Sequence, residues 1–579
     1  MTRMKSIFSV LLLTAIVSVG PLSHAQTTTV KVVLAGSSAM WQSMALAAYN
    51  KGLCVSGGTA PCFHYTASNF NLADGRPTVK GGSTAVDLGN VWLVWDSNTT
   101  STNVWAYIKV DSGVGDRCYF AQPHCNVNIS SVPAPANLIS STLWGDSSSD
   151  STPPAAVSAL FTSGTLLVNA AATDIRPEDA LFATCRANSK LGGGIDALAG
   201  LGYGVNNSGV CPAFGAALAN LEGSDILSAY PGSTSTAHVL AFNISGKDPF
   251  TGTAIPAAST TSVGAAPIIF ITQRTGALAT VTNATDAELH AAFGGSNCDA
   301  SAFGAPSAPI QVYLREPLSG TMNTTEYTVF RYPGFSGTSQ ETGVAAANPL
   351  EKACTAGGKR FRAIGTGEEV KSVLNSGANN GTDGIGYTFF SYGNVSTIAD
   401  SASYGYLTLN GIDGIFHKYG TTIDPGQPAI AGALPSSSTL PAACLGNFPC
   451  AEKLIWSGNL SFPNLRNGSY RAWSTLRIVS NGTALAAANL LVIGSQSYAV
   501  STVPDFVPAI KVTTLDPGLA LLRSHYTQEG VAPVNIAASG DRGGDAGGCI
   551  LTSSGNAATS DTTTKLAQVA PDGSCISVP

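Results

Sequence analysis

Charged side chains are scarce in this sequence. Only 11% of its 579 residues are Asp, Glu, Lys or Arg, and the formal net charge is -6. A protein that binds the phosphate backbone of a nucleic acid needs a basic face, and this charge balance does not favour one. We therefore expect no nucleic-acid partner.

Long hydrophobic runs are missing beyond the N-terminus. No later stretch reaches the roughly 18 uncharged apolar residues that span a membrane. The N-terminus carries Arg3 and Lys5, then an apolar run over residues 7–19 and the small-x-small pattern Ser23-His24-Ala25. This order is typical of a secretory signal peptide over residues 1–25. We expect a periplasmic or secreted protein without a membrane anchor.

Motifs of metal centres and of hydrolases are also missing. No cysteine couple has Cys-x-x-Cys spacing, and the histidines are scattered without a His-Glu-x-x-His pattern, so we predict no metal and no cofactor. A hydrolase is the enzymatic alternative for an exported α/β protein. It is disfavoured because the sequence has no Gly-x-Ser-x-Gly elbow and no His near a candidate nucleophile at a strand end. We predict that the protein is not an enzyme.

Twelve cysteines are present, all after the predicted signal peptide. An even number in an exported chain is typical of disulfides. Pairing neighbours along the chain predicts six bonds, although the sequence leaves other connectivities open. The predicted couples are Cys54 with Cys62, Cys118 with Cys125, Cys185 with Cys211, Cys298 with Cys354, Cys444 with Cys450, and Cys549 with Cys575.

Strand-like apolar runs alternate with helix-like segments, which predicts an α/β architecture. A Ser-, Pro- and Asn-rich surface insertion is expected over residues 126–154, a Gly- and Ala-rich loop region over 192–256, and a weakly structured C-terminal tail after about 512. The predicted strands cover residues 30–35, 91–95, 104–110, 166–172, 267–272, 310–314, 384–390 and 474–479. The predicted helices cover residues 39–50, 286–293, 322–330, 365–374 and 483–491, and a hairpin with an Asn410-Gly411 turn is predicted over 404–415.

The strand over residues 310–314 runs directly into Arg315-x-x-x-Ser319-Gly320-Thr321, and a helix-like segment follows. A helix N-terminus presents unpaired backbone N–H groups and the positive end of the helix dipole, so it favours anions. Gly320 allows close approach of the backbone, and Arg315 adds a planar fork of donors suited to an oxyanion. The alternative is an ordinary turn with Arg315 on the surface.

Three other strands end in a similar way. Gly36-Ser37-Ser38 precedes the helix over residues 39–50, and the strand over 104–110 ends in a small-residue loop with Ser112 and Gly115. Asp174 follows the strand over 166–172, at the carboxyl end where open α/β sheets bind ligands. Capping of a helix is the alternative role for the serine of Gly36-Ser37-Ser38, and capping of a helix or turn is the alternative role for Asp174.

Together, Gly36-Ser37-Ser38, Asp174, Arg315-x-x-x-Ser319-Gly320-Thr321 and Gly384-Ile385-Gly386-Tyr387 resemble the periplasmic phosphate-binding protein of the phosphate ABC transporter. The resemblance implies two α/β lobes joined by a hinge, with the anion held in the cleft between them. It places lobe 1 at residues 26–265 and 456–512, lobe 2 at 266–455, and the tail at 513–579. The implied partners are inorganic phosphate or a related oxyanion and an ABC permease, with a monomeric receptor.

The resemblance also implies the phosphate-binding residues. Ser38 and Ala39 match positions that donate backbone N–H groups, although Ala39 stands where the family has an aromatic residue. Asp174 matches the aspartate that accepts the proton of monobasic phosphate. Such an acceptor rejects sulfate, which has no proton to offer. The full predicted set is Ser38, Ala39, Ser112, Asp174, Arg315, Ser319, Gly320 and Thr321.

Two functions from different classes are compatible with these patterns. The first is a secreted solute-binding protein that captures phosphate for ABC-type uptake, by hinge closure and without chemistry. The alternative is an extracellular surface or adhesion protein on the same fold whose ligand is lost or changed. The Ser- and Thr-rich loops, the disulfides and the C-terminal tail are compatible with that alternative, and we favour the first.

Overall fold

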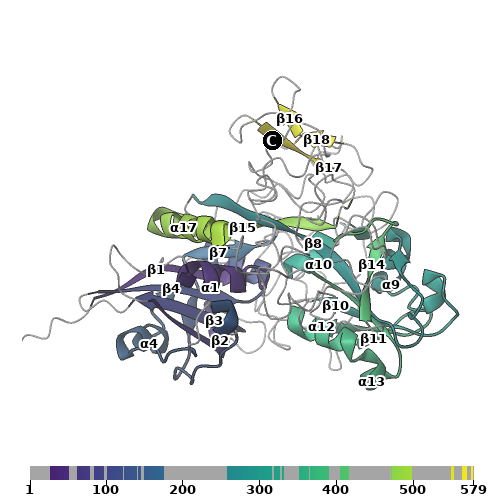
Figure 1. Ribbon diagram of the computed structural model, residues 1–579, viewed down its shortest axis with the longest axis horizontal. Helices are drawn as coiled ribbons and strands as arrows, with labels where there is room; N and C mark the ends of the chain where they lie inside the picture. Colours follow the sequence, from purple (N-terminus) through teal and green to yellow (C-terminus); the bar gives the residue numbers. More distant parts are fainter. Residues whose placement is uncertain are drawn as a thin grey trace, which may run out of the picture.

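The computed structural model describes residues 27–50, 62–77, 84–96, 101–121, 123–139, 141–144, 149–174, 257–315, 319–325, 329–330, 351–363, 365–389, 404–415, 470, 472–498, 550–552, 564–569 and 575–577. The predicted signal peptide and the predicted loop region over residues 192–256 lie outside these residues. The fold is α/β, as the alternating pattern predicts, with two lobes linked by two long strands (Figure 1).

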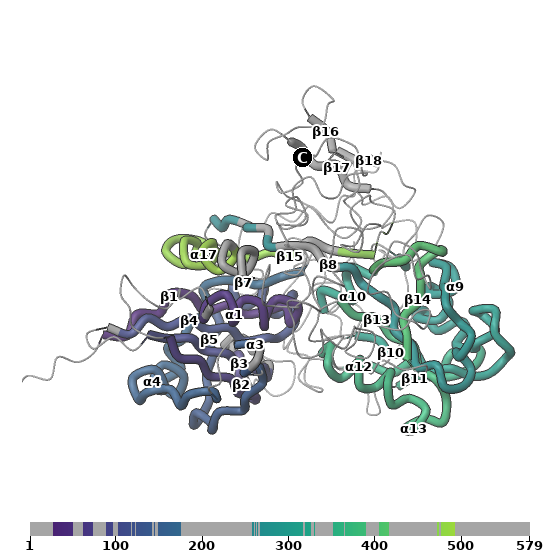
Figure 2. The backbone as a smooth tube through the Cα atoms, viewed as in Figure 1, coloured from purple at the N-terminus to yellow at the C-terminus, as the bar shows by residue number. Residues whose placement is uncertain are grey.

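The first lobe combines early elements with two late ones. Its early elements are β1 (Thr27–Gly36), α1 (Trp41–Asn50), β2 (Cys62–Pro77), β3 (Thr84–Asp96), β4 (Ser101–Lys109), α2 (Ser112–Phe120), β5 (Asn126–Asn128), α3 (Ser141–Trp144), α4 (Ala155–Thr162), β6 (Leu166–Leu167) and β7 (Ala170–Thr173). The late ones are β15 (Trp473–Ser480) and α17 (Gly482–Tyr498), which the chain reaches by returning from the second lobe (Figure 2).

The second lobe is continuous in sequence. Its elements are β8 (Ser259–Gln273), β9 (Asn283–Ala284), α9 (Asp286–Gly294), η2 (Ala300–Phe303), β10 (Gln311–Arg315), α10 (Gly320–Thr325), β11 (Glu351–Ala353), β12 (Lys359–Ala363), α12 (Thr366–Leu374), α13 (Ser376–Asn380), β13 (Gly384–Phe389) and β14 (Tyr404–Leu409). β10 runs parallel to β12 and β13, so the carboxyl end of β10 lies at the same sheet edge as theirs.

Strand β1 lies at the centre of the first lobe, parallel to β4 on one side and β7 on the other. Its successive residues Val32, Val33, Leu34 and Ala35 are all fully buried. Val32 and Leu34 pack with α1 and α17, whereas Val33 and Ala35 pack with α2 and α4 on the opposite face. A strand covered on both faces needs an unbroken apolar run, which is the pattern that this stretch of sequence has.

Strand β8 joins the two lobes within one hydrogen-bonded sheet. Residues 259–267 pair antiparallel with β15, and residues 268–273 pair with β13 and β14 in the second lobe. The predicted strand over 267–272 is therefore the second half of a longer one. β8 and β15 therefore both pass between the lobes, and the lobe boundaries given above stay a proposal.

Several local predictions are confirmed. The helix predicted over residues 286–293 is α9, and it begins with a capping box: Thr285 N donates to Glu288 Oε2 at 2.7 Å, and Glu288 N donates to Thr285 Oγ1 at 3.3 Å. Asn410 and Gly411 both have positive φ and make the turn after β14, where Leu409 bridges to Ile412. Turns of this kind need left-handed backbone, which Asn and Gly tolerate best.

Four expectations about local structure were wrong. The loop expected around Ser112 is the first turn of α2, because Gly115 lets this helix lie directly on β1, where an added Cβ would overlap the carbonyl oxygen of Ala35. The strand expected over 166–172 is two strands, β6 and β7, and the helix expected from Met322 instead begins at Gly320.

The fourth concerns residues 126–154, which are not simply a surface insertion. Asp150 is buried, and its Oδ1 lies 2.8 Å from Nδ1 of His64, a residue of β2. The ring of His64 stacks on Trp144 with centroids 4.2 Å apart. Because buried polar groups need partners, these contacts attach the segment to the first lobe.

Two predicted disulfides are confirmed, Cys118–Cys125 and Cys298–Cys354. Cys62 is also disulfide-bonded, and its predicted partner, Cys54, lies outside the described residues. The other three predicted couples also lie wholly or partly outside the described residues. In the tail, β16 (Ile550–Thr552), β17 (Thr564–Val569) and β18 (Cys575–Ser577) form a separate antiparallel sheet. Among the described helices, none has the length and apolarity needed to cross a membrane.

Candidate functional site

The predicted site residues of the first lobe lie where three parallel strands end. Because β1, β4 and β7 run in the same direction, their carboxyl ends meet at one edge of the sheet. Ser37 N donates to the carbonyl of Ala172 at 2.7 Å, and Val110 N donates to that of Gly36 at 2.9 Å. These bonds hold the segments that follow the three strands side by side.

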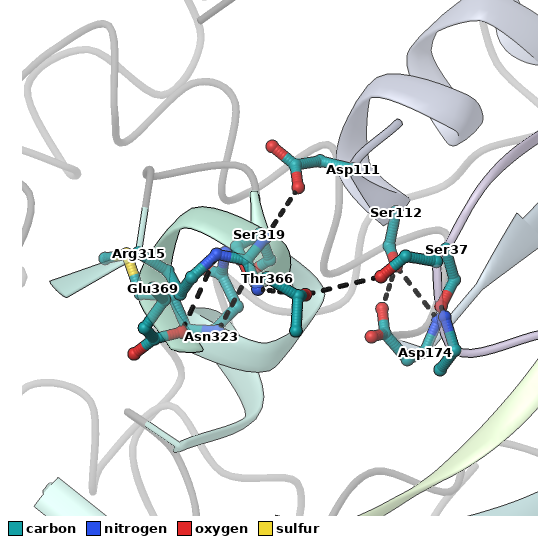
Figure 3. A network of polar contacts seen from close by, with 12 residues as sticks. Ser37, Asp111, Ser112, Asp174, Arg315, Ser319, Asn323, Thr366 and Glu369 are labelled. Carbon is teal, nitrogen blue, oxygen red and sulfur yellow. Dashed lines mark hydrogen bonds and ion pairs between the residues drawn. The ribbon is translucent and has the colours of Figure 1, made fainter. Parts of the chain in front are cut away.

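Asp174 and Ser112 form the centre of this edge. Both are buried, at 3% and 2% exposure. The hydroxyl of Ser112 donates to Oδ1 of Asp174, and its oxygen accepts from the backbone N–H of Asp174 at 3.3 Å (Figure 3). Ser112 and Asp174, which follow different strands, are therefore hydrogen-bonded to each other.

Burial raises the pKa of Asp174 to about 7, because desolvation disfavours the charged carboxylate. The positive charges of Arg315 and Arg477 and a hydrogen bond with Ser37 act in the opposite direction. Burial, and then the charge of Asp174, raises the pKa of Tyr107 well above its usual value. Asp174 is therefore a carboxyl whose protonation changes near neutral pH.

Arg315 supplies the positive charge from the second lobe. It is the last residue of β10, and it is only 2% exposed. Its Nη1 donates to Oγ1 of Thr366 at 2.7 Å, and its Nη2 donates to Oδ1 of Asp111 at 3.0 Å. Nε lies 3.9 Å from Oε2 of Glu369, which is fully buried. The guanidinium thus lies between groups from both lobes, as Figure 3 shows.

Helix α10 begins where the motif predicts an anion-binding turn. Ser319 is buried and caps the helix: its Oγ accepts from the N–H of Met322 at 3.2 Å. Gly320 lies against the first lobe, because an added Cβ would overlap Oδ1 of Asp174 and lie 2.7 Å from Oγ of Ser112. The first residues of α10 and the Asp174 carboxyl are therefore in contact across the lobes.

Helix α12 adds a second connection between the lobes. Its first residue, Thr366, has its hydroxyl 3.3 Å from that of Ser38. On the following turn, Oε1 of Glu369 accepts from the backbone N–H of Tyr387 at 3.0 Å. Thr366 therefore contacts both Ser38 of the first lobe and Arg315 of its own lobe.

The structure brings five of the eight predicted residues together, either in direct contact or through one shared partner. Ser112, Asp174 and Gly320 contact one another, and Ser38 and Arg315 share Thr366 as a partner. Ser319 and Thr321 flank Gly320 and are buried. The backbone N–H of Ala39 donates to Oγ of Ser37 at 3.2 Å, within its own loop.

Sequence reasoning missed several residues of the site. Ser37 is part of the Gly36-Ser37-Ser38 motif and Asp111 precedes Ser112, whereas Thr366 lies in a segment that was expected only as a helix. Arg477 had no signal, because it lies inside β15, where it pairs with Thr173, the residue before Asp174. Its side chain is 1% exposed. The missed residues are Ser37, Asp111, Thr366, Glu369 and Arg477.

This arrangement suits an oxyanion that carries a proton. The guanidinium and the hydroxyls donate, and the Asp174 carboxylate, when ionised, accepts. Within the described part of the chain, no group of three or more His, Cys, Asp or Glu side chains is placed to hold a metal ion.

No family model and no curated protein matches this chain. Among solved structures, it is similar to an ABC-type phosphate transport receptor from Vibrio cholerae, with 13% identity and a TM-score of 0.23 over 42% of this chain and 70% of that one. It is similar to PstS from Borrelia burgdorferi, with 15% identity and a TM-score of 0.22 over 42% and 67%. It is also similar to a human phosphate binding apolipoprotein, with 12% identity and a TM-score of 0.32 over 83% and 93%. Since these identities and scores are low, the function proposed below rests on this chain's own residues.

Proposed function

We propose that this chain is a solute-binding protein that captures phosphate, or a related oxyanion, between its two lobes. The observation that carries the proposal is that a buried acceptor of the first lobe lies against the start of the helix that follows a buried donor of the second lobe. Arg315 ends β10 of the second lobe, Asp174 follows β7 of the first, and Gly320 of α10 lies directly against Asp174. Hydroxyls of Ser38, Ser112 and Thr366 surround them.

Each group has a clear role toward such a ligand. A buried anion is costly to desolvate unless many donors replace its water, and one guanidinium with several hydroxyls supplies them. The Asp174 carboxylate accepts the proton of a protonated phosphate oxygen. Sulfate has no such proton, so it would bring two acceptors face to face. Sulfate would leave the Asp174 carboxylate without a hydrogen-bond donor, and this cost makes the site prefer phosphate.

The wider role follows from this proposal. The chain would be exported and would deliver its ligand to an ABC permease as a monomeric receptor, opening and closing about β8 and β15. The lobe boundaries at residues 265–266 and 455–456 belong to the same proposal. Titration with a purified cognate permease in vesicles, and light scattering of the purified receptor, would test these points.

The direct test is calorimetric titration of phosphate into the chain from Gln26 onward, after unfolding and refolding to remove bound anion. We expect phosphate binding, no sulfate binding, and loss of phosphate binding in Arg315→Gln. Lys371→Gln is the matched control, because Lys371 is an exposed cation of α12. Absence of heat and of thermal shift with phosphate in the unmodified chain would overturn the proposal.

A further inference from the structure

Asp111 contacts the cation of the candidate site from the opposite lobe. Asp111 lies two residues after the end of β4, and its Oδ1 accepts from Nη2 of Arg315 at 3.0 Å (Figure 3). The side chains are 15% and 3% exposed. A charge-assisted hydrogen bond that is so well shielded from water is stronger than a surface ion pair. The contact therefore connects the two lobes.

The same N–H group of Arg315 is suited to an incoming oxyanion. A carboxylate oxygen and a phosphate oxygen accept from guanidinium in the same way, so one competes with the other for this donor. Glu369 also lies near Arg315, with Oε2 3.9 Å from Nε, but it belongs to α12 of the same lobe. Opening of the lobes would separate Asp111 from Arg315 and would leave Glu369 in place.

We propose that Asp111 is a latch that lowers ligand affinity: its carboxylate holds Arg315 across the lobes and must give up that donor to the anion. The inference rests on the proposed function for its ligand, although the latch itself is a contact within the chain. Two consequences follow. A bound anion is repelled by a nearby carboxylate, and the arrangement in which Asp111 holds Arg315 competes with the arrangement that admits the anion.

The neutral contact between Ser38 and Thr366, at 3.3 Å, also connects the lobes. Neither hydroxyl is charged, so this contact does not compete with an oxyanion for a guanidinium donor. Removal of the Asp111 charge should therefore raise the affinity for phosphate, whereas removal of a residue that binds phosphate should lower it. A residue that helps to bind phosphate weakens binding when it is changed, whereas the latch strengthens it.

The test uses the chain from Gln26 onward with Asp111→Asn, which keeps the size of the side chain and removes its charge. Glu351→Gln is the control for net charge, because Glu351 pairs with Lys359 at a partly exposed position, with side chains 28% and 48% exposed. Phosphate affinity is measured by titration calorimetry, and the radius of gyration by X-ray scattering in anion-free buffer. We expect Asp111→Asn to bind phosphate about tenfold more tightly and to be more extended without anion. Glu351→Gln should match the unmodified chain in both.

Unchanged or weaker phosphate binding by Asp111→Asn, together with unchanged scattering, would overturn the latch. If the unmodified chain binds no phosphate, the proposed function fails, and the latch is then decided by scattering alone. A larger radius of gyration for Asp111→Asn would support it in that case, and an unchanged radius would overturn it.

Discussion

Gly320 of the second lobe lies directly against the carboxyl of Asp174 in the first lobe, so closely that a Cβ atom added to Gly320 would overlap Oδ1 of Asp174. The same added atom would lie 2.7 Å from Oγ of Ser112. A side chain at this position would force the Asp174 carboxyl and the Ser112 hydroxyl to shift while the lobes are in the described arrangement. Glycine therefore allows the contact between the lobes in its present form.

Gly320→Ala should prevent this approach. The methyl group would separate α10 from Asp174, so the residues of the two lobes could no longer surround one anion. We expect phosphate affinity to fall by at least about tenfold, equivalent to about 1.4 kcal/mol. Titration calorimetry measures this loss.

Gly367→Ala is the matched control, because an added Cβ at Gly367 in α12 meets nothing within 4 Å. Alanine in place of glycine in a helix is favourable by up to about 1 kcal/mol, so this variant should bind phosphate normally and melt no lower than the unmodified chain. Equal phosphate affinities for the two variants would show that the contact with Asp174 is not needed for binding.

Asp174→Asn should change the dependence of stability on pH. The pKa of Asp174 is about 7 in the folded protein, above its ordinary value of 3.8. The folded state therefore binds more protons than the unfolded state between these values, and the contribution of Asp174 to stability falls as pH rises through this range. Replacement by Asn should raise the melting temperature at pH 8 and have little effect at pH 4.

The measurement is thermal unfolding of both proteins in phosphate-free buffer at the two pH values. Because the entropy of unfolding grows with chain length, the melting temperature of a chain of this size moves by about 1 °C per kcal/mol. A melting difference that is the same at both pH values would contradict the raised pKa. Asp174→Asn should also reduce the discrimination against sulfate, because the amide can donate to an oxygen that carries no proton.

Lys109→Met should stabilise the protein at neutral pH. Nζ of Lys109 lies 4.6 Å from the centroid of the Trp41 ring, and burial lowers the pKa of this lysine from 10.5 to about 8. Between these values the unfolded state binds more protons than the folded state, so the stability of the unmodified chain rises with pH across this range. Methionine fills a similar space without a charge.

We therefore expect the melting temperature of Lys109→Met to exceed that of the unmodified chain by more at pH 7 than at pH 10. Calorimetric unfolding at both pH values measures this difference. If the advantage is independent of pH, then burial of the ammonium group is not its cause. A charged Lys109 is also attracted to the Trp41 ring. Loss of this attraction in Lys109→Met would reduce the gain in melting temperature by the same amount at every pH at which the lysine is charged.

The two described disulfides should contribute unequally to stability. Cys298–Cys354 joins residues 56 apart in the sequence, whereas Cys118–Cys125 joins residues 7 apart. Closing a longer loop removes more entropy from the unfolded chain, which predicts about 4 kcal/mol for the first bond and about 2–3 kcal/mol for the second. Denaturant unfolding of the two double-serine variants measures both losses, and a larger loss for the shorter loop would contradict this explanation.

Local structure was largely predictable because short segments carry its causes. The apolar run over residues 30–35 predicted a strand, which is β1, and Asn410-Gly411 predicted a turn, in which both residues have positive φ. The Ser112 segment was misjudged as a loop. Its glycines are typical of loops, but Gly115 is there to let α2 lie on β1. A requirement that arises from close packing cannot be recognised from the segment alone.

The candidate site also contains residues that could be predicted from the sequence and residues that could not. Arg315, Ser319 and Gly320 could be predicted because they follow one strand and precede one helix, and Asp174 because it ends another strand. Their proximity, and the parts played by Asp111, Thr366 and Arg477, could not be predicted, because those residues come from other elements.

Short stretches of sequence thus specified many of the strands and turns and the kinds of donor and acceptor that follow several strands. These depend on backbone preferences and on the alternation of apolar and polar residues over a few positions. Only the tertiary structure decided that Asp111 holds Arg315 and that Gly320 lies on Asp174. Those contacts exist because β8 and β15 bring two separately packed lobes together, and the arrangement of the lobes is a property of the whole chain.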